Sequence, residues 1–184
     1  MNRLVRLLAV ALSLACFAAG CFLVQQPAAA QQPNQEQLQK LEWMIGTWVC
    51  RGRTAAGEPR TITRKYQWSL EENYITCLSV IRVGRQVALA HRHMIGWDPD
   101  KGIYRTWVFS SNGDFVRAVW PDVEGDRRGG TLAGLTPNNE QISAKAVYTR
   151  EDDDTLRYQV SEYTIGGEPQ PDMDLTFKRA NSDP

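Results

Sequence analysis

Over most of the chain, apolar and polar side chains alternate one by one in short segments. In the segment 62–68, Tyr66 and Trp68 fall on one side, and the polar residues Lys65 and Gln67 fall on the other. Similar alternation recurs close to the C-terminus. Successive side chains of a β-strand point to opposite faces, so a period of two residues indicates strands buried on one face and hydrated on the other. This pattern constrains the fold more than any other feature.

Turn-forming segments separate these runs at a spacing of about ten residues. The segments 98–102 and 112–114 are typical, with Pro, Gly, Asn and Asp clustered together. Ten candidate strands lie between such turns. An open sheet of that many strands would leave two unpaired edges, so we expect it to close. The sequence therefore predicts an all-β fold, a closed antiparallel up-and-down barrel spanning residues 37–180.

One short helix is expected before the first strand. Asn34 is a candidate N-cap, and Gly46 ends the helical pattern. The apolar residues at helical spacing between them are Leu38, Leu41 and Ile45. We expect this helix to plug one end of the barrel, residues 31–36 to form a flexible leader, and residues 181–184 to form a disordered tail.

The first 30 residues have the pattern of a secretory signal peptide. Two arginines flank the start of an apolar run over residues 4–19, and residues 28–30 are three alanines suited to a cleavage site. We therefore expect export to the periplasm or the cell exterior, with no membrane span after processing. The alternative is that residues 18–21 act as a lipobox, which would place a lipid anchor on Cys21.

The charge balance argues against two classes of partner. Two of the 21 basic residues and none of the 21 acidic residues lie before Gln31, which leaves a formal charge of −2 on the remainder. No run of Lys or Arg stands out. Nucleic acid and anionic membrane surfaces are therefore not expected as partners. The sequence does not indicate an oligomeric state.

Two cysteines, Cys50 and Cys77, follow the expected cleavage site. An exported protein meets oxidising conditions, so these residues could pair. If their strands are separated by one further strand, however, the backbones lie ~9.6 Å apart, which is too far for a disulfide. The sequence leaves both outcomes open.

The tripeptide Gly46-Thr47-Trp48 resembles the Gly-x-Trp motif of the lipocalin and calycin superfamily. In that superfamily the tryptophan packs across the closed barrel end against an arginine of the last strand. The resemblance implies a structural, barrel-closing role for Gly46, Trp48 and Arg179. Alternation places Arg179 on the same face as Phe177, and an inward arginine can stack on the face of a tryptophan.

The central segment 95–104, Ile-Gly-Trp-Asp-Pro-Asp-Lys-Gly-Ile-Tyr, resembles a hairpin of an uncharacterised family of bacterial lipocalin-like domains in exported proteins. That family also carries Leu-x-x-x-x-Gly-x-Trp, which matches residues 41–48. In outline the chain is also similar to nitrobindin, a ten-stranded barrel that holds haem through a histidine near the C-terminus. The last histidine here is His93, so no haem cofactor is implied. Neither resemblance implies an established reaction.

The only histidines, His91 and His93, are two residues apart and so share one face of a strand. That face is expected to point inward. A metal site or an acid–base pair would need a further ligand. Glu162 is the nearest candidate, because it lies an even number of residues from Tyr158 and is therefore expected on the same face of the strand. Alternatively, the two histidines are structural and either form hydrogen bonds among aromatic residues or lie at the barrel mouth. A third interpretation is that they contact an organic ligand.

Inward aromatic side chains could line a cavity for an apolar or planar ligand, or could simply fill the core. The candidate cavity residues are Tyr66, Trp68, His91, His93, Trp107, Tyr158 and Glu162. We expect a non-enzymatic barrel that binds a small apolar or amphipathic molecule without a cofactor. The alternative is a metal- or haem-dependent protein or enzyme that uses His91 and His93.

Overall fold

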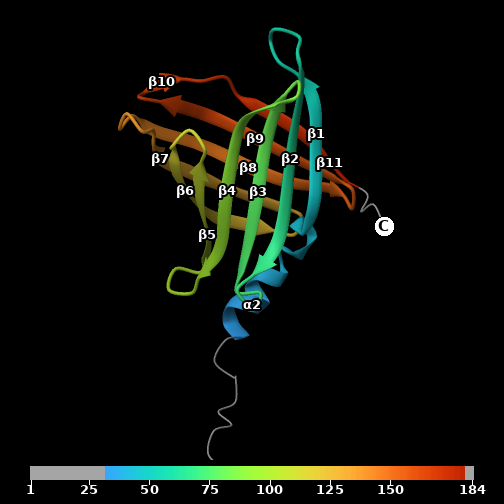
Figure 1. Cartoon of the computed structure of the whole chain (residues 1–184). Coiled ribbons are helices and arrows are strands. Elements are labelled where there is room, and N and C mark those ends of the chain that lie inside the picture. The colour runs from blue at the N-terminus through green and yellow to red at the C-terminus, as the bar shows by residue number, and fades with distance from the viewer. Residues whose placement is uncertain (1–31, 181–184) are drawn as a thin grey trace, which may run out of the picture. The chain divides into compact units, whose positions relative to one another are not determined.

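The computed structural model describes residues 32–180 (Figure 1). The expectations for the signal peptide, for a lipid anchor at Cys21 and for the tail 181–184 concern residues outside this range. Within residues 32–180, no helix combines the length and the apolar character needed to cross a membrane.

The chain forms a closed antiparallel barrel of ten strands, as predicted, with one additional two-residue strand, β10. Each barrel strand pairs with the next along the chain, and β11 pairs with both β9 and β1 to close the barrel. The strands are β1 (Gly46–Arg53), β2 (Pro59–Ser69), β3 (Tyr74–Val83), β4 (Gln86–Asp98), β5 (Ile103–Ser110), β6 (Phe115–Glu124), β7 (Arg127–Leu135), β8 (Gln141–Asp152), β9 (Thr155–Ile165), β10 (Glu168–Pro169) and β11 (Met173–Arg179).

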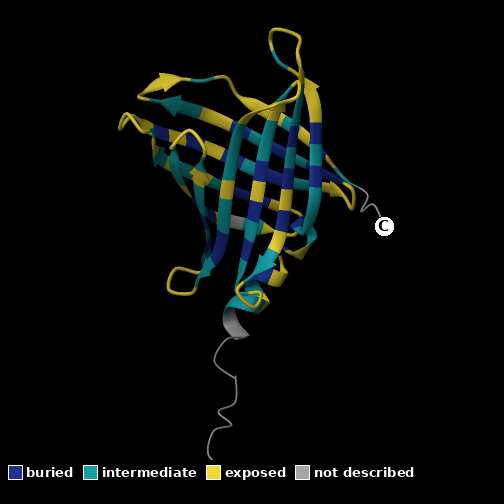
Figure 2. Ribbon diagram, viewed as in Figure 1, coloured by how far each residue is buried: buried dark blue, intermediate teal, exposed yellow. Residues whose placement is uncertain are grey.

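Alternation along the strands produces the barrel interior. In β8, Ile142, Ala144, Ala146 and Tyr148 are buried, and the residues between them are exposed or half-buried. Figure 2 shows the same banding across neighbouring strands. The period of two residues seen in the sequence therefore corresponds to inward and outward faces of the barrel wall.

The N-terminal helix differs from the prediction. Helix α2 (Gln32–Gln39) begins inside the expected leader, so Asn34 is a helical residue and not the N-cap. The chain then tightens into a short 3-10 helix, η1 (Glu42–Met44). The fully buried residues Leu38, Leu41 and Met44 are three positions apart, which suits a 3-10 turn, and the amide of each later residue donates to the carbonyl three positions before it at 2.9 Å.

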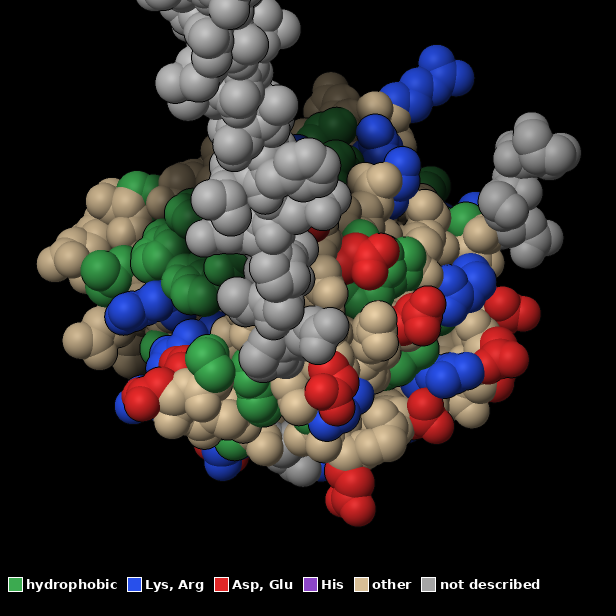
Figure 3. All heavy atoms as spheres, turned by 90° about the horizontal axis from the view of Figure 1, so that it is seen from below, with side chains coloured by type: hydrophobic (Ala, Val, Ile, Leu, Met, Phe, Trp, Pro, Cys, Tyr) green, Lys and Arg blue, Asp and Glu red, His purple; other side chains and the backbone are tan. Residues whose placement is uncertain are grey.

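Helix α2 lies at one end of the barrel, beside the turn that joins β2 and β3 (Figure 1). Gln35 Nε2 donates to the Glu71 carbonyl of that turn at 2.6 Å, and the Tyr104 hydroxyl donates to the Gln37 carbonyl at 2.7 Å. Where the described residues are visible from this end, acidic and basic side chains are interspersed (Figure 3). The helix thus covers one mouth of the barrel.

The predicted contact between Trp48 and Arg179 is present at this end. The two residues are cross-strand partners, and the guanidinium carbon lies 4.2 Å from the ring centroid. Trp48 is fully buried and donates from Nε1 to the Met44 carbonyl at 2.8 Å. Gly46 has a φ of 122°, and a Cβ there would lie 2.7 Å from Nη1 of Arg179. The glycine therefore leaves room for the arginine.

Arg179 also binds the main chain around the barrel end. Its Nη1 donates to Ile45 at 2.7 Å, its Nη2 to Trp43 at 3.0 Å, and its Nε to Asp153 at 3.0 Å, in each case to the carbonyl oxygen. Arg179 thus ties η1 and the β8–β9 turn to the closing strand.

Cys50 and Cys77 are both buried and unpaired. Cys50 lies on β1 opposite Ile62, whereas Cys77 lies on β3 opposite Tyr66, so β2 separates them. Cys50 and Cys77 are thus free thiols within residues 32–180, because the intervening strand keeps their backbones too far apart for a disulfide.

Candidate ligand cavity

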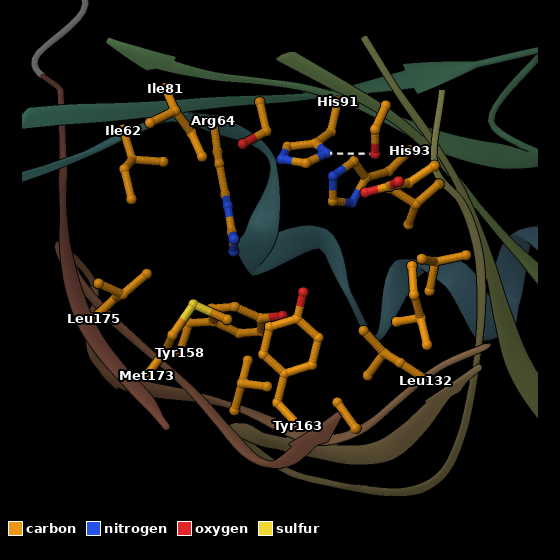
Figure 4. A pocket seen from close by; sticks show the side chains of 18 of the residues that line it. Ile62, Arg64, Ile81, His91, His93, Leu132, Tyr158, Tyr163, Met173 and Leu175 are labelled. Carbon is orange, nitrogen blue, oxygen red and sulfur yellow. Dashed lines mark hydrogen bonds between the residues drawn. The ribbon is translucent and has the colours of Figure 1, made fainter. Parts of the chain in front are cut away.

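The half of the barrel away from α2 contains a cavity of about 520 Å³ (Figure 4). Its rim includes the half-buried Asp114, beside the β5–β6 turn, and the exposed residues Pro171 and Asp172, before β11. The cavity thus opens at the end opposite the helix. Its wall is largely aliphatic, from Ile62, Ile81, Val108, Val116, Leu132, Ile142, Ala144, Val160 and Leu175. Its volume lies within the range typical of small-molecule sites.

Packed aromatic rings form the floor of the cavity. The rings of Trp120 and Tyr148 lie 5.6 Å apart between centroids, and those of Tyr148 and Tyr158 lie 4.4 Å apart. Tyr66 is buried beside them, two residues nearer the helix end than Arg64 on β2. The remaining void in this region is only about 30 Å³. The aromatic side chains therefore act as filler in one half of the barrel and as a floor for the other.

Arg64 is buried midway along β2, and its guanidinium projects into the cavity (Figure 4). Its Nη1 donates to the Tyr148 hydroxyl at 2.9 Å. Its guanidinium carbon lies 4.4 Å from the ring centroid of Tyr158 and 4.7 Å from that of Phe177. Nε has no hydrogen-bond partner among the described residues. Aromatic faces and one hydroxyl therefore surround this cation.

A second arginine, Arg128 on β7, is buried at the aromatic floor. Its Nη2 donates to the Thr106 hydroxyl at 3.0 Å, and its guanidinium lies 4.1 Å from the Trp120 ring centroid. Burial lowers the pKa of Arg128 to about 10, which leaves it protonated at neutral pH. In residues 32–180 neither Arg64 nor Arg128 forms an ion pair with a carboxylate. The barrel interior therefore holds two positive charges without a buried acid.

His91 and His93 face the cavity from β4, as predicted. His91 Nδ1 lies 2.8 Å from Ser110 Oγ, and the two imidazole rings meet edge to face with centroids 6.1 Å apart (Figure 4). His93 keeps some accessible surface toward the cavity, but its Nε2 is enclosed and has no hydrogen-bond partner among the described residues.

Burial, followed by the positive charge of Arg64, lowers the pKa of His91 below its usual value, with Asp114 acting in the opposite direction. The same two causes lower the pKa of His93 further. Both imidazoles are therefore neutral at pH 7. In the described part of the chain, no group of three or more His, Cys, Asp or Glu side chains is placed to hold a metal ion.

Of the seven predicted cavity residues, three line the main cavity, one lies beneath it, and three lie elsewhere. Tyr158, His91 and His93 line the main cavity, and Tyr66 lies beneath it in the floor. Trp68 is half-buried against the core near the helix end, away from the main cavity.

Trp107 was predicted to face the cavity, but it lies on the outer surface of the barrel. On β5 the residues that point inward are Thr106 and Val108, and the Trp107 ring lies instead over Gly96, beside Tyr74. This assignment was wrong because β5 carries apolar side chains on both faces, so alternation alone does not determine which face is buried.

Glu162 was also predicted to face inward, and it does not. It has a φ of 51°, is exposed, and pairs with Lys145 at 2.7 Å. The register between β8 and β9 shifts here, so that Glu162 is an extra residue on β9 and Tyr163 takes the next inward position. A β-bulge thus turns the carboxylate outward and brings a phenol to the cavity wall.

Arg64 was missed, although the sequence carried a signal for it. It alternates in step with Ile62 and Tyr66, so the pattern that turned Tyr66 inward also turned Arg64 inward. A charged residue on the apolar side of a strand is unusual unless it is paired or functional.

The fold and the site define a closed β-barrel with an internal cavity that opens at one end. The chain matches no model of a known protein family and no curated protein.

Proposed function

We propose that this chain is a non-enzymatic binding protein that holds a small amphipathic molecule in the barrel cavity. The observation that supports this function is the cavity of about 520 Å³, which combines an aliphatic wall with a few polar groups. Ligand sites commonly have this composition, since apolar contacts supply binding energy and a few polar groups set orientation.

Small inward side chains keep the space open. Ser79, Ser110 and Ala144 line the cavity at positions where larger residues would fill it. Small barrels usually fill their interiors with side chains, and an unfilled space forfeits dispersion contacts. Binding a ligand would restore contacts that the empty cavity lacks.

We further propose that the protein acts in the periplasm or outside the cell and is related to lipocalin-like domains. Export rests on the signal-peptide pattern of residues 1–30, and the relationship rests on the Gly-x-Trp motif and its arginine partner. Mass spectrometry of the mature protein recovered from the producing cells tests export, with Gln31 as the expected first residue. Retention of residues 1–30 would contradict cleavage after Ala30.

Filling the cavity tests the binding function. Ala144→Trp places a large side chain in the cavity, whereas Ala133→Trp adds the same side chain on the exposed face of neighbouring β7. The neutral probe N-phenyl-1-naphthylamine should bind the wild type and Ala133→Trp with 1:1 stoichiometry, and Ala144→Trp should lose this binding while remaining folded by circular dichroism. Failure of the wild type to bind the probe, or equal binding by both variants, would refute the proposal.

A metal- or haem-dependent function that uses His91 and His93 remains the alternative proposal. Nε2 of His93 favours it, because this nitrogen is buried without a hydrogen-bond partner among the described residues. The nearby positive charge of Arg64 opposes a bound cation. Stoichiometric metal, or a Soret band, that disappears in the His91→Ala/His93→Ala double variant would support this alternative over the first proposal.

A further inference from the structure

Arg64 places a positive charge at the inner end of the cavity without an acidic partner. Its side chain is 7% exposed, and its described contacts are the Tyr148 hydroxyl and the faces of aromatic rings. A buried charge is costly unless it is paired, because aromatic faces and a hydroxyl replace only part of its hydration. The empty barrel therefore carries a charge that an anion would neutralise.

The chemistry of the guanidinium specifies the kind of anion. Arginine presents several N–H donors in a rigid plane that matches the two oxygens of a carboxylate. Nη1 of Arg64 already donates to the Tyr148 hydroxyl, while the guanidinium points into the open space (Figure 4). An anionic head group at this point would form charge-assisted hydrogen bonds in an enclosed setting.

The other charges near the cavity favour the same position for the head group. The lining carboxylates Asp114, Asp172 and Asp174 lie toward the exposed rim, and Asp174 is already paired with Arg157 at 2.6 Å. Deeper in the barrel, Arg128 adds a second positive charge at the floor. Arg60 adds one positive charge at the rim, which therefore carries both signs, whereas both charges at the inner end are positive. An anion is thus attracted most strongly to the inner end of the cavity.

We propose that the ligand is an amphipathic anion, with its carboxylate bound by Arg64 and its apolar tail directed toward the cavity mouth. This inference rests on the proposed binding function and specifies the class of ligand. The tail would run along the aliphatic wall above Arg64, which includes Ile62, Ile81, Leu132, Ile142 and Leu175. His91 and His93 border the head group as neutral hydrogen-bonding groups.

Two probes that differ only in the head group test this assignment. Decanoate and 1-decanol have the same chain length, and each can be titrated against bound N-phenyl-1-naphthylamine. We expect the wild type to bind decanoate about 10- to 100-fold more tightly than 1-decanol, the ratio typical of a charge-assisted hydrogen bond.

The matched variants are Arg64→Met and Arg60→Met, since both arginines line the cavity but Arg60 lies at the more exposed start of β2. Arg64→Met should lower the affinity for decanoate about 10- to 100-fold and leave that for 1-decanol within about threefold. Arg60→Met should change both affinities by less than about threefold, because a charge near water is screened.

The outcomes separate the two proposals. If 1-decanol displaces the probe as well as decanoate does, or if Arg64→Met retains the preference for decanoate, the anion assignment is wrong while the binding function stands. If the wild type does not bind N-phenyl-1-naphthylamine at all, both proposals fall. Should Arg64→Met fail to fold, the preference measured in the wild type alone decides the question.

Discussion

The half of the barrel near α2 is filled with side chains, whereas the opposite half encloses a cavity. Near the helix, Leu38, Met44, Trp48, Leu156 and Phe177 have no exposed surface. Toward the mouth, inward residues such as Leu132 and Leu175 remain partly exposed because they face the cavity.

The same strands build both halves, so the difference lies in side-chain size. From the helix end toward the mouth, the inward face of β8 presents Tyr148, then Ala146, then Ala144. The ring of Tyr148 packs against Trp120 and Tyr158, while Ala144 leaves space before it. The strands thus form the barrel wall, and the volumes of the inward side chains determine which part of the interior is left unfilled.

The largest effect is expected at the packed end. Trp48→Ala should lower the free energy of unfolding by ~3–5 kcal/mol, because it removes a fully buried ring and leaves Arg179 without its stacking partner. Urea denaturation of the mature protein measures this change. Trp107→Ala on the outer face is the control and should cost clearly less. Similar losses in both variants would contradict the closed-end arrangement.

One leucine in each half of the barrel allows the two halves to be compared with the same side chain. Leu156 is fully buried at the packed end, whereas Leu175 borders the cavity. Leu156→Ala should cost ~2–5 kcal/mol, the usual range for a core leucine, and Leu175→Ala only ~1 kcal/mol, because part of its surface is already accessible. Equal costs in ligand-free protein would mean that the upper half is packed as tightly as the lower half.

Two arginines extend the comparison to charged groups. Arg179→Met should destabilise the protein by ~2–4 kcal/mol, because three main-chain carbonyls lose their donors. Arg64→Met should leave the stability of the ligand-free protein unchanged or raise it by up to ~2 kcal/mol, since the lost charge has no acidic partner. Thermal unfolding measures both, and a large loss in Arg64→Met would indicate a mainly structural arginine.

The smallest effect is a pH dependence from His93. Its folded-state pKa lies well below the unfolded value of ~6.5, so the unfolded chain binds a proton that the native protein excludes. Its contribution to stability is therefore intact above about pH 6.5 and is lost as pH falls below that value, by at most ~1.4 kcal/mol per pH unit.

His93→Asn should reduce the loss of stability between pH 7.5 and 5 by ~1–2 kcal/mol relative to the wild type. His91→Asn is the matched control and should show a smaller change, because the His91 ring is less enclosed and its pKa is lowered less. Identical pH profiles for His93→Asn and the wild type would place His93 in a hydrated environment.

The barrel and its closure could be predicted because both depend on local alternation and on one motif. Alternation identified the strands and placed Arg179 on the inward face, and the resemblance to the Gly-x-Trp motif implied its contact with Trp48, which is its cross-strand partner. The same rule failed at Trp107, where both faces of β5 are apolar, and at Glu162, where one extra residue interrupts the count. Counting in steps of two thus predicts the inward residues reliably only along a strand that has no bulge and one polar face.

The cavity itself could not be predicted from the pattern. Alternation indicates which side chains point inward, but it does not show whether their volumes fill the barrel interior. Inward aromatic residues are compatible with both a filled core and an open cavity. The positive charge of the site could be predicted from the sequence, because Arg64 occupies an inward position between Ile62 and Tyr66. The predicted cavity residues did not include it, because they were aromatic residues, the two histidines and Glu162 as a possible further ligand.

The extra residue at Glu162 has a consequence for how this barrel tolerates changes in length. In a closed barrel no strand can slide to absorb an insertion, because every strand is hydrogen-bonded on both sides and the stagger is fixed around the ring. The added residue is instead accommodated where it occurs: β8 and β9 are paired again beyond it, at Ser143 and Thr164. Deleting Glu162 would thus shorten β9 while leaving Val160 and Tyr163 on the same inward side, which makes this position a natural place for the wall to gain or lose a residue.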